Sequence, residues 1–369
     1  MSKNRFYDSR LSYLSFVQNT NEKKVISDKI YPYLSKLPHR DVYHFLDAGI
    51  GDGTITSNII KKFHALKPDS LLCITGKEIS FEDVFNSLIK MPDRFIEHPK
   101  LALTLTNMKF SEIGALASAN NHSKVKIKNL VLKGSNAHDF EKQLDKLELF
   151  INKNWGFDID KNGRTAYVKP CIINIFREDQ EKLIIGHLPK AKKNNVYDFI
   201  LASQAYRSRS STKAKISNVI NPLSKILKQD GLLVITHSVG HDSIEKIFNI
   251  ASVKSNFFPD TSKTLIAAIK DSDLFSSKGF KFSSPKKYSY NFRQIPSEIV
   301  AEMSSSSLHS KISNIFYIAQ LSKEESELLQ NNASKINKIK KAILNQDTLF
   351  FNNEIFSIKK QRIKRKSES

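Results

Sequence analysis

A glycine-rich segment in the first quarter of the chain combines residue types that suit a ligand-binding turn. Its sequence is Asp47-Ala48-Gly49-Ile50-Gly51-Asp52-Gly53, and it joins an apolar run to a stretch with helical spacing. Glycines let a backbone turn sharply and let a ligand lie against it without meeting a side chain. The spacing differs from the Gly-x-Gly-x-x-Gly of dinucleotide-binding turns, and two aspartates flank the cradle. Such a turn favours a positively charged ligand over a pyrophosphate.

A further acidic residue follows the next predicted strand. Glu78 comes after the apolar run at residues 71–75. In a parallel sheet the carboxyl ends of the strands face one ligand crevice, so Glu78 is expected beside the glycine turn. A carboxylate in that place can accept hydrogen bonds from both hydroxyls of a ribose. The two motifs together predict a ligand that carries a ribose and a positive charge.

This combination resembles the class I S-adenosylmethionine (SAM)-dependent methyltransferases. The matching residues form the first motif of that family and its ribose-binding acid: Asp47, Gly49, Gly51, Gly53 and Glu78. Residues 197–203 resemble the fourth strand of the family. Residues 227–235 resemble the turn into the fifth strand, with Gln229-Asp230-Gly231 where Pro-Gly-Gly is usual. The resemblance covers residues 42–110 and 196–250, and it implies SAM as the cofactor and no metal ion.

The resemblance also implies where cofactor and acceptor meet. Asn107 follows the third strand, where the family often has a residue near the adenine, and Ser203 ends the fourth strand facing the reactive methyl. Residues 203–206, Ser-Gln-Ala-Tyr, are similar to the [Asp/Asn/Ser]-Pro-Pro-[Tyr/Phe/Trp] tetrapeptide of amino- and amide-nitrogen methyltransferases, without its prolines. Gln204 is therefore expected to bind the acceptor, and Tyr206 is expected to be a catalytic residue that stacks on the methylated group. An ordinary strand-to-loop junction explains the same residues.

Three more residues near strand ends are candidates for acting on the acceptor. His237 follows the fifth predicted strand, and a neutral imidazole there can take a proton from an attacking hydroxyl or amine. Arg207 and Arg209 lie just beyond the fourth strand and can bind a carboxylate or phosphate of the substrate. Methyl transfer often needs only alignment and desolvation, so a base is optional. Loop residues without a chemical role are the alternative for all three.

The elements that must position these residues alternate along the chain. Apolar runs at residues 42–47, 71–75 and 101–110 predict strands, with helices between them. Strands are expected again at the following residues: 196–202, 231–236, 287–293 and 348–358. This order predicts an α/β fold with a Rossmann-like, mostly parallel seven-stranded sheet and helices on both faces. The serine run at residues 304–307 is expected to be a loop.

The chain divides into five predicted parts. Residues 1–40 form an N-terminal helical cap, in which segment 16–21 is expected to face the cofactor, and residues 41–110 form the first half of the SAM-binding core. Residues 111–195 are less regular and are expected to be an inserted lid. Residues 196–358 complete the core, and residues 359–369 form a basic tail.

Composition narrows the classes of protein that remain. The chain of 369 residues has a net charge of +21, with 40% hydrophobic and 10% aromatic residues. It is too apolar for a disordered chain, and two cysteines exclude a disulfide framework and a four-cysteine zinc site. No apolar run is long enough to span a membrane and the N-terminus lacks a signal core, so a cytoplasmic location is expected. The charge is spread along the chain except for six basic residues in segment 359–366, which favours a small-molecule partner over nucleic acid.

Three functions are compatible with the sequence. The first is methyl transfer from SAM to a small or medium-sized acceptor, for which Arg207 and Arg209 suggest an anionic group. The second is methylation of amino nitrogens in RNA or DNA, with the basic surface and tail binding phosphates. The third is a SAM-fold module that binds without catalysis.

Overall fold

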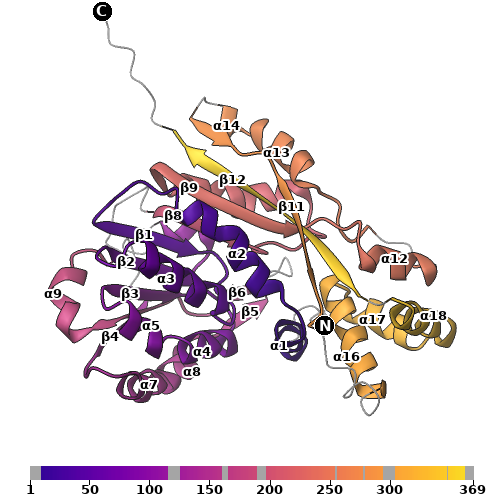
Figure 1. Cartoon of the computed structure of the whole chain (residues 1–369), viewed down its shortest axis with the longest axis horizontal. Coiled ribbons are helices and arrows are strands. Elements are labelled where there is room, and N and C mark those ends of the chain that lie inside the picture. Colours follow the sequence, from indigo (N-terminus) through magenta and orange to yellow (C-terminus); the bar gives the residue numbers. More distant parts are fainter. Residues whose placement is uncertain are drawn as a thin grey trace, which may run out of the picture.

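The computed structural model describes most of the chain. The described residues are 10–114, 125–159, 165–188, 197–253, 256–276, 279–293, 304–346 and 348–361. Figure 1 shows a central sheet between layers of helices, with a further group of helices at one end of the molecule.

Within the described residues, ten strands form the central sheet. They are β1 (Val42–Asp47), β2 (Leu71–Lys77), β3 (Leu101–Thr106), β4 (Lys126–Leu132), β7 (Cys171–Arg177), β8 (Tyr197–Ser203), β9 (Leu227–Ser238), β10 (Phe280–Phe282), β11 (Lys286–Asn291) and β12 (Phe350–Lys360). Their order is β10-β12-β9-β8-β1-β2-β3-β7-β4, and β11 also pairs with β12. The five strands from β9 to β3 are parallel, whereas β12 is antiparallel to β9 and β7 to β3. Strands β5 (Phe157–Ile159) and β6 (Thr165–Tyr167) form a separate antiparallel pair.

The strand order reverses direction at β1, as it does in Rossmann-like folds. Strands β2 and β3 follow on one side of β1, and β8 and β9 follow on the other. The predicted fold class is therefore confirmed, and all seven predicted strands are present. The sheet is larger than predicted because β4, β7 and β10 extend its edges. Ligands of such sheets bind outside the carboxyl ends of the strands at the reversal, here between β1 and β8.

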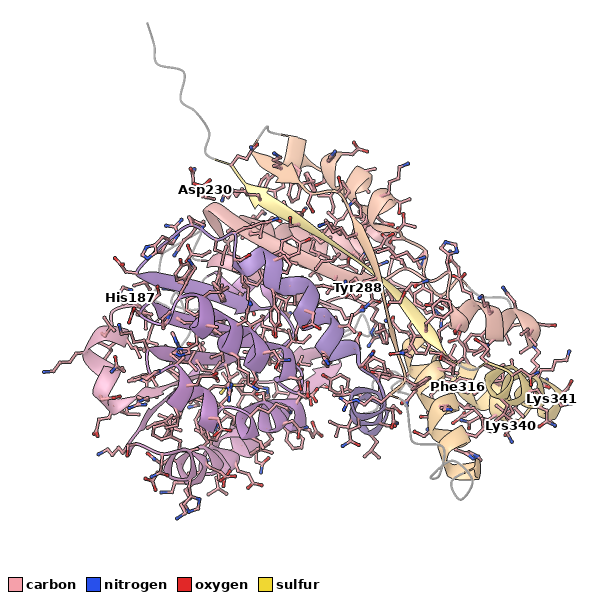
Figure 2. All side chains as sticks on the ribbon, viewed as in Figure 1. His187, Asp230, Tyr288, Phe316, Lys340 and Lys341 are labelled. Atoms are coloured by element: carbon pink, nitrogen blue, oxygen red, sulfur yellow. The ribbon has the colours of Figure 1, made fainter. Side chains whose placement is uncertain are left out.

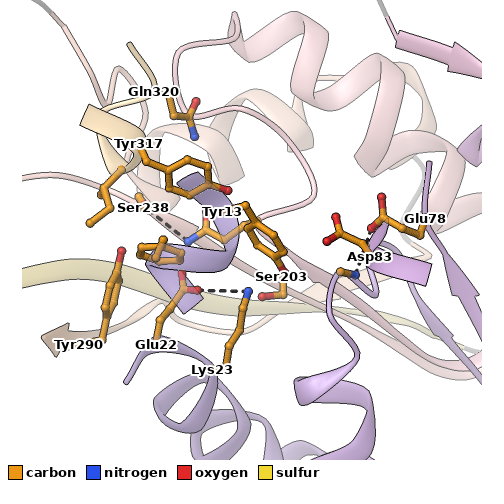
Figure 3. Close-up of a pocket in the computed structure, with 15 residues that line it drawn as sticks. Tyr13, Glu22, Lys23, Glu78, Asp83, Ser203, Ser238, Tyr290, Tyr317 and Gln320 are labelled. Atoms are coloured by element: carbon orange, nitrogen blue, oxygen red, sulfur yellow. Dashed lines mark hydrogen bonds and ion pairs between the residues drawn. The ribbon is translucent and has the colours of Figure 1, made fainter. Parts of the chain in front are cut away.

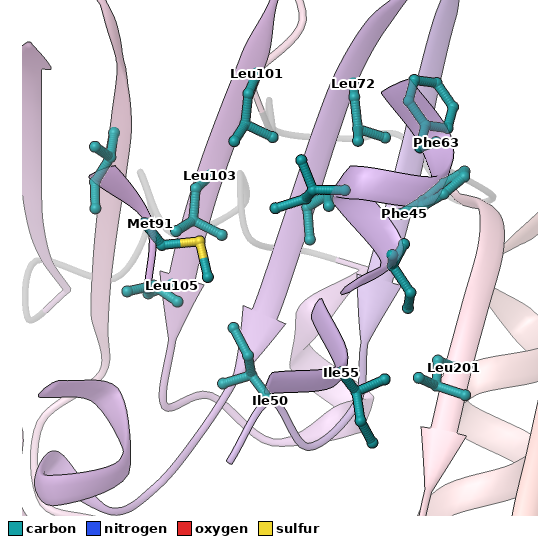
Figure 4. Packing of buried hydrophobic residues seen from close by; sticks show 14 of the residues in the cluster. Phe45, Ile50, Ile55, Phe63, Leu72, Met91, Leu101, Leu103, Leu105 and Leu201 are labelled. Atoms are coloured by element: carbon teal, nitrogen blue, oxygen red, sulfur yellow. The ribbon is translucent and has the colours of Figure 1, made fainter. Parts of the chain in front are cut away.

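Helices cover both faces of the sheet because successive side chains of each strand point to opposite faces. Phe45 belongs to the apolar cluster on one face, shown in Figure 4, and its neighbour Leu46 belongs to the cluster on the other. The first cluster receives α2 (Glu22–Leu34), α3 (Thr54–Leu66), α4 (Phe81–Ile89), α5 (Pro92–Glu97), α7 (Ala137–Asp145) and α8 (Leu147–Asn154). The second receives α6 (Phe110–Ile113), a π-helical turn (Ile216–Ile220), α11 (Asn221–Lys225), α13 (Ser262–Lys270) and α14 (Asp273–Ser276). The short helices α9 (Glu181–Ile184) and α10 (Thr212–Lys215) lie in connections.

A third apolar cluster joins the two ends of the chain. Its helices are α1 (Arg10–Asn19), α12 (Ser243–Ile250), α16 (Ser304–Ile318), α17 (Lys323–Gln330) and α18 (Ala333–Leu344). Phe316 is fully buried in it, and Figure 2 labels Phe316 at this end of the molecule. The expected loop at residues 304–307 is wrong, because α16 begins at Ser304. Burial of Ile315 and Phe316 outweighs the low helix propensity of the preceding serines.

The structure adds strands to two of the predicted parts. The described part of residues 111–195 extends the sheet through β7, which pairs with β3, and β4, which pairs with β7. Strand β12 runs to Lys360, so the predicted basic tail begins inside a strand, and residues 362–369 lie outside the described residues. Among the described helices, none has the length and apolarity needed to cross a bilayer.

Candidate functional site

The glycine turn links the end of β1 to the start of α3. Gly51 and Gly53 have positive φ angles of 52° and 77°, which residues with a side chain rarely adopt. A Cβ on Gly53 would lie 2.7 Å from Cα of Ser87, so this glycine permits close contact between α3 and the end of α4. A Cβ on Gly49 would meet no atom within 4 Å. Gly49 therefore presents open backbone, whereas Gly53 serves contact between helices.

Asp47 shapes this turn from inside. Its Oδ2 accepts a hydrogen bond from the Thr56 hydroxyl at 2.6 Å, and its Oδ1 accepts one from the Gly49 N–H at 3.2 Å. The side chain is buried, and burial raises the pKa of the carboxyl above its ordinary value. Asp47 was predicted to bind the cofactor, and in the structure its oxygens accept hydrogen bonds from Gly49 in the turn and from Thr56 on α3.

Glu78 joins the glycine turn to the end of β2. Its Oε2 accepts the Gly51 N–H at 3.1 Å, and its Oε1 accepts the N–H groups of Ile79 and Ser80 at 2.7 and 3.0 Å. A carboxylate has about four acceptor positions, so one position on Oε2 remains. The direct bond to Gly51 places Glu78 against the glycine turn.

A cavity of about 190 Å³ opens beside these residues at the carboxyl ends of the strands (Figure 3). The glycine turn, the residue after β2, and the ends of β8 and β9 form its floor, and α1, α2, α4, β11 and α16 contribute its walls. The lining residues are Tyr13, Phe16, Glu22, Lys23, Gly49, Gly51, Glu78, Asp83, Ser203, Gln204, Ser238, Tyr290, Tyr317, Ile318 and Gln320. Three carboxylates and one amine are among them, so the pocket carries an excess of negative charge in a chain whose net charge is +21.

Lys23 is the cation of this lining. Its Nζ lies 3.3 Å from Oε2 of Glu22 and 5.5 Å from the centre of the Tyr13 ring. Burial alone would lower the pKa of Lys23, but Tyr13, Glu22 and Asp52 around it reverse that effect, and the net pKa is raised. Lys23 therefore stays protonated at neutral pH and offsets one of the three carboxylates.

Tyr13 covers the glycine turn from above. Its hydroxyl accepts the Asp52 N–H at 3.2 Å, and a Cβ built on Gly51 would overlap that hydroxyl. Its ring also contacts Tyr317, with 6.2 Å between the ring centres. Tyr13 was not among the predicted site residues, although the helix that carries it was expected to cover the cofactor. Phe16, in the segment 16–21 singled out from the sequence, does line the pocket.

Ser203 and Gln204 lie in the pocket at the end of β8. The Ser203 hydroxyl is buried and has no hydrogen-bond partner among the described residues. Gln204 has a positive φ of 50°, and its amide nitrogen donates to the Ser238 hydroxyl at 3.2 Å. The structure thus brings both residues to the glycine turn and Glu78, as the sequence predicted.

His237 and Tyr206, the two predicted catalytic residues, do not line this pocket. Ser238 faces the pocket, and because neighbouring residues of a strand point to opposite faces, His237 points away from it. Its Nε2 lies 2.9 Å from the Ser262 hydroxyl, and its ring centre is 5.8 Å from that of Tyr206. Burial, with a smaller effect of Lys215, lowers the pKa of His237 to about 3. The geometry gives neither residue access to a ligand in the pocket.

The remaining predicted residues are also outside the lining. Arg209 forms a two-point ion pair with Glu325 at 2.6 and 2.8 Å, which ties the loop after β8 to α17. Arg207, its neighbour in the same loop, is not in the lining. The side-chain amide of Asn107 accepts the Cys171 N–H at 2.8 Å and donates to the Lys169 carbonyl at 2.9 Å, so it holds β3 to β7. Sequence spacing could not reveal these partners, which come from distant segments.

The described residues contain no group of three or more His, Cys, Asp or Glu side chains placed to hold a metal ion. Both cysteines are buried, and burial raises the pKa of each thiol to about 12. A thiol held in its neutral form is a poor nucleophile.

No protein-family model matches the sequence, and no curated protein sequence matches it. Solved structures do match. The chain is similar to the MccD protein, at 11% identity and a TM-score of 0.33 over 93% of this chain and 100% of that chain. It is similar to phosphoethanolamine N-methyltransferase 2 of Haemonchus contortus in complex with S-adenosyl-L-methionine, at 13% identity and a TM-score of 0.34 over 93% and 53% of the two chains. It is also similar to a SAM-dependent methyltransferase from Archaeoglobus fulgidus, at 11% identity and a TM-score of 0.31 over 92% and 94%.

Likeness at these TM-scores transfers no residue role, substrate or cofactor to this chain. SAM-dependent methyltransferases, the class that the sequence resembles, are among the solved structures to which the chain is similar. Its own strand order, which reverses at β1 and carries the antiparallel β12 beside β9, assigns the chain to the Rossmann-like fold class.

Proposed function

We propose that this chain is a SAM-dependent methyltransferase that acts on a small acceptor held between the glycine turn and helix α1. The observation that carries the proposal is the bond from the Gly51 N–H to Glu78, at 3.1 Å, beside the open backbone of Gly49. This pairing gives one ligand a surface free of side chains and a carboxylate that can accept from a ribose. Both lie at the strand reversal where Rossmann-like sheets bind their ligands.

The chemistry of the lining fits SAM. Bound SAM would supply a methyl group already activated as a sulfonium, and three carboxylates against one amine favour a cation of that kind. Glu78 would hold the ribose, and Gly49 would let the cofactor lie against the backbone. The cavity is smaller than the 300–1,000 Å³ common for ligand sites, and the hydroxyl of Tyr13 occupies space beside Gly51.

The residues around the acceptor support transfer by alignment and exclusion of water. Ser203 offers an unpaired hydroxyl and Gln204 a side-chain amide on the floor of the pocket. Tyr290 and Tyr317 form an aromatic wall that keeps water from the reacting groups. No histidine is in the described lining, which agrees with a reaction in which positioning replaces a base.

Enclosure of the pocket by α1, β11 and α16 supports a small acceptor over a polymer. With Arg209 bound to Glu325, Lys23 is the lining residue able to meet an anionic group of the acceptor. We keep the cytoplasmic location and the five-part division of the chain as proposals from the sequence.

Titration calorimetry with SAM tests the proposal. Glu78→Gln should weaken SAM binding by roughly ten- to a hundredfold, because a hydrogen bond to a charged group contributes about 1.5–3 kcal/mol. The matched control is Glu141→Gln on α7, an exposed carboxylate outside the pocket, which should bind SAM like the original chain. Equal binding by both variants would refute the ribose assignment.

A transfer assay with methyl-labelled SAM and pools of small amines, alcohols and thiols decides whether the site is catalytic. Formation of S-adenosylhomocysteine with one pool supports the proposal. Binding without turnover in every pool would support a non-catalytic SAM module, and absence of SAM binding would refute both.

A further inference from the structure

A second and larger cavity, of about 640 Å³, lies toward the opposite ends of the parallel strands. One wall is the second half of α2 with the residues that follow it, and the other is formed by β11 and the end of β12 beside the start of β9. Asp230 and Tyr288, which both line it, lie along β12 in Figure 2. This groove shares no lining residue with the pocket beside the glycine turn.

The groove has the opposite charge to the first pocket. Five lysines line it: Lys29 and Lys36 on the wall of α2, and Lys286, Lys287 and Lys359 on the wall of strands. All five side chains are exposed to solvent. Asp28 and Asp230 are the acidic residues of the lining, and Asp230 is 3.8 Å from the Lys359 amine. Two facing rows of amines suit a ligand with negative charges repeated along its length.

We propose that this groove binds the phosphodiester backbone of single-stranded nucleic acid without preference for its sequence. Lysines act as flexible point charges on phosphates, and among the described residues the lining contains no arginine for two-point reading of base edges. A flexible single strand can place successive phosphates along the two walls, and sites for single strands combine such positively charged grooves with aromatic side chains. Tyr33, half-buried in the wall of α2, adds an aromatic side chain of the kind on which bases stack.

The sequence after the groove supports the same ligand. Lys359 lines the groove near the end of β12, and four basic residues follow at positions 362–366. The proposal is independent of methyl transfer, since the groove and the pocket share no lining residue, although α2, β9 and β11 contribute to both.

Fluorescence anisotropy with a labelled oligouridylate of about twelve nucleotides tests the proposal. If the five lysines meet phosphates, the logarithm of the binding constant should fall against the logarithm of salt with a slope of about −3 to −3.5. Replacing Lys29, Lys36 and Lys287 together by Gln should reduce this slope by about 2. Affinity near 0.1 M salt should then fall roughly a hundredfold.

The matched control replaces three exposed lysines on other helices, Lys142, Lys153 and Lys182, by Gln. It has the same net charge as the groove variant and should bind nearly as tightly as the original chain. Thermal unfolding of both variants checks that the fold is retained.

Four outcomes would overturn the proposal. The first is that the original chain fails to bind the oligonucleotide at low salt. The second is that the two triple variants lose affinity equally, which would indicate binding by diffuse charge. Neutralising the four basic residues of segment 362–366 abolishes binding while the groove variant retains it. Inorganic tripolyphosphate competes as well as the oligonucleotide at equal phosphate concentration.

Discussion

The substitution Gly51→Ala tests the contact between the glycine turn and helix α1. Gly51 has a positive φ of 52°, and a Cβ at this position would overlap the hydroxyl of Tyr13. That hydroxyl accepts the Asp52 N–H at 3.2 Å. Alanine at position 51 should therefore destabilise the folded chain even when no ligand is present.

The expected size of the effect follows from two contributions. A left-handed backbone costs a residue with a Cβ about 1–2 kcal/mol. Displacement of Tyr13 loses one hydrogen bond, with a net value of about 0.5–1.5 kcal/mol. The free energy of unfolding, measured in urea, should fall by about 1.5–3.5 kcal/mol in total.

Gly49→Ala is the matched control in the same turn. Gly49 lacks a positive φ, and its added Cβ would meet no atom within 4 Å, so the free energy of unfolding should change by less than about 0.5 kcal/mol. The new methyl group points into the pocket, however, and SAM binding measured by calorimetry should weaken by about tenfold or more. Gly51→Ala is therefore expected to lower the free energy of unfolding, whereas Gly49→Ala is expected to weaken SAM binding with little change in that free energy.

Tyr13→Phe completes the test because it removes the hydroxyl that the new Cβ would overlap. The double variant with Gly51→Ala should lose about 1 kcal/mol less than the sum of the single losses. Strict additivity, or a Gly51→Ala variant as stable as the original chain, would refute the placement of Tyr13 over the turn.

Two further predictions concern the buried groups behind β8 and β9. Lys215→Met should lower the free energy of unfolding in urea by about 3–5 kcal/mol, because it leaves Asp260 buried without the amine that lies 2.7 Å away, and adding Asp260→Leu should recover part of the loss. His237 should contribute to acid sensitivity, since its pKa of about 3 lies below the value of about 6.5 of an unfolded imidazole. The unfolded chain then binds a proton between pH 6.5 and 3 that the folded chain does not. The free energy of unfolding should therefore decrease by about 1.4 kcal/mol for each unit by which the pH is lowered within that window. His237→Gln should remove this part of the pH dependence.

Sequence patterns predicted the parallel core well because its strands are buried on both faces. Such strands appear as continuous apolar runs, and the runs before Asp47 and Glu78 both became strands. The prediction of a loop at residues 304–307 was wrong, because burial of Ile315 and Phe316 in the same helix outweighs the low helix propensity of its serines. Strands β7 and β4, which lie beyond β3 in the sheet, were missed as part of the main sheet because pairing between distant segments leaves no local signal.

The cofactor side of the site was more predictable than the acceptor side. Glu78 and Gly51 follow strands in a fixed order, so their proximity follows from the topology. Whether His237 or Ser238 faces the pocket depends on a register of one residue, which an apolar run does not specify. Tyr13 and Tyr317 reach the site only through contact between α1 and α16, which no sequence spacing encodes.

The pocket walls come from the first and the last third of the chain, and this has a consequence for biosynthesis. Phe16 on α1 contacts Tyr290 and Tyr317, with ring centres 6.1 and 5.2 Å apart, so one side of the pocket exists only after α16 has left the ribosome. Because synthesis adds roughly 5–20 residues per second, Tyr290 and Tyr317 are made on the order of tens of seconds after α1. A nascent chain with a finished glycine turn therefore still lacks its ligand site, and ligand binding can stabilise the protein only after nearly all of the chain has been made.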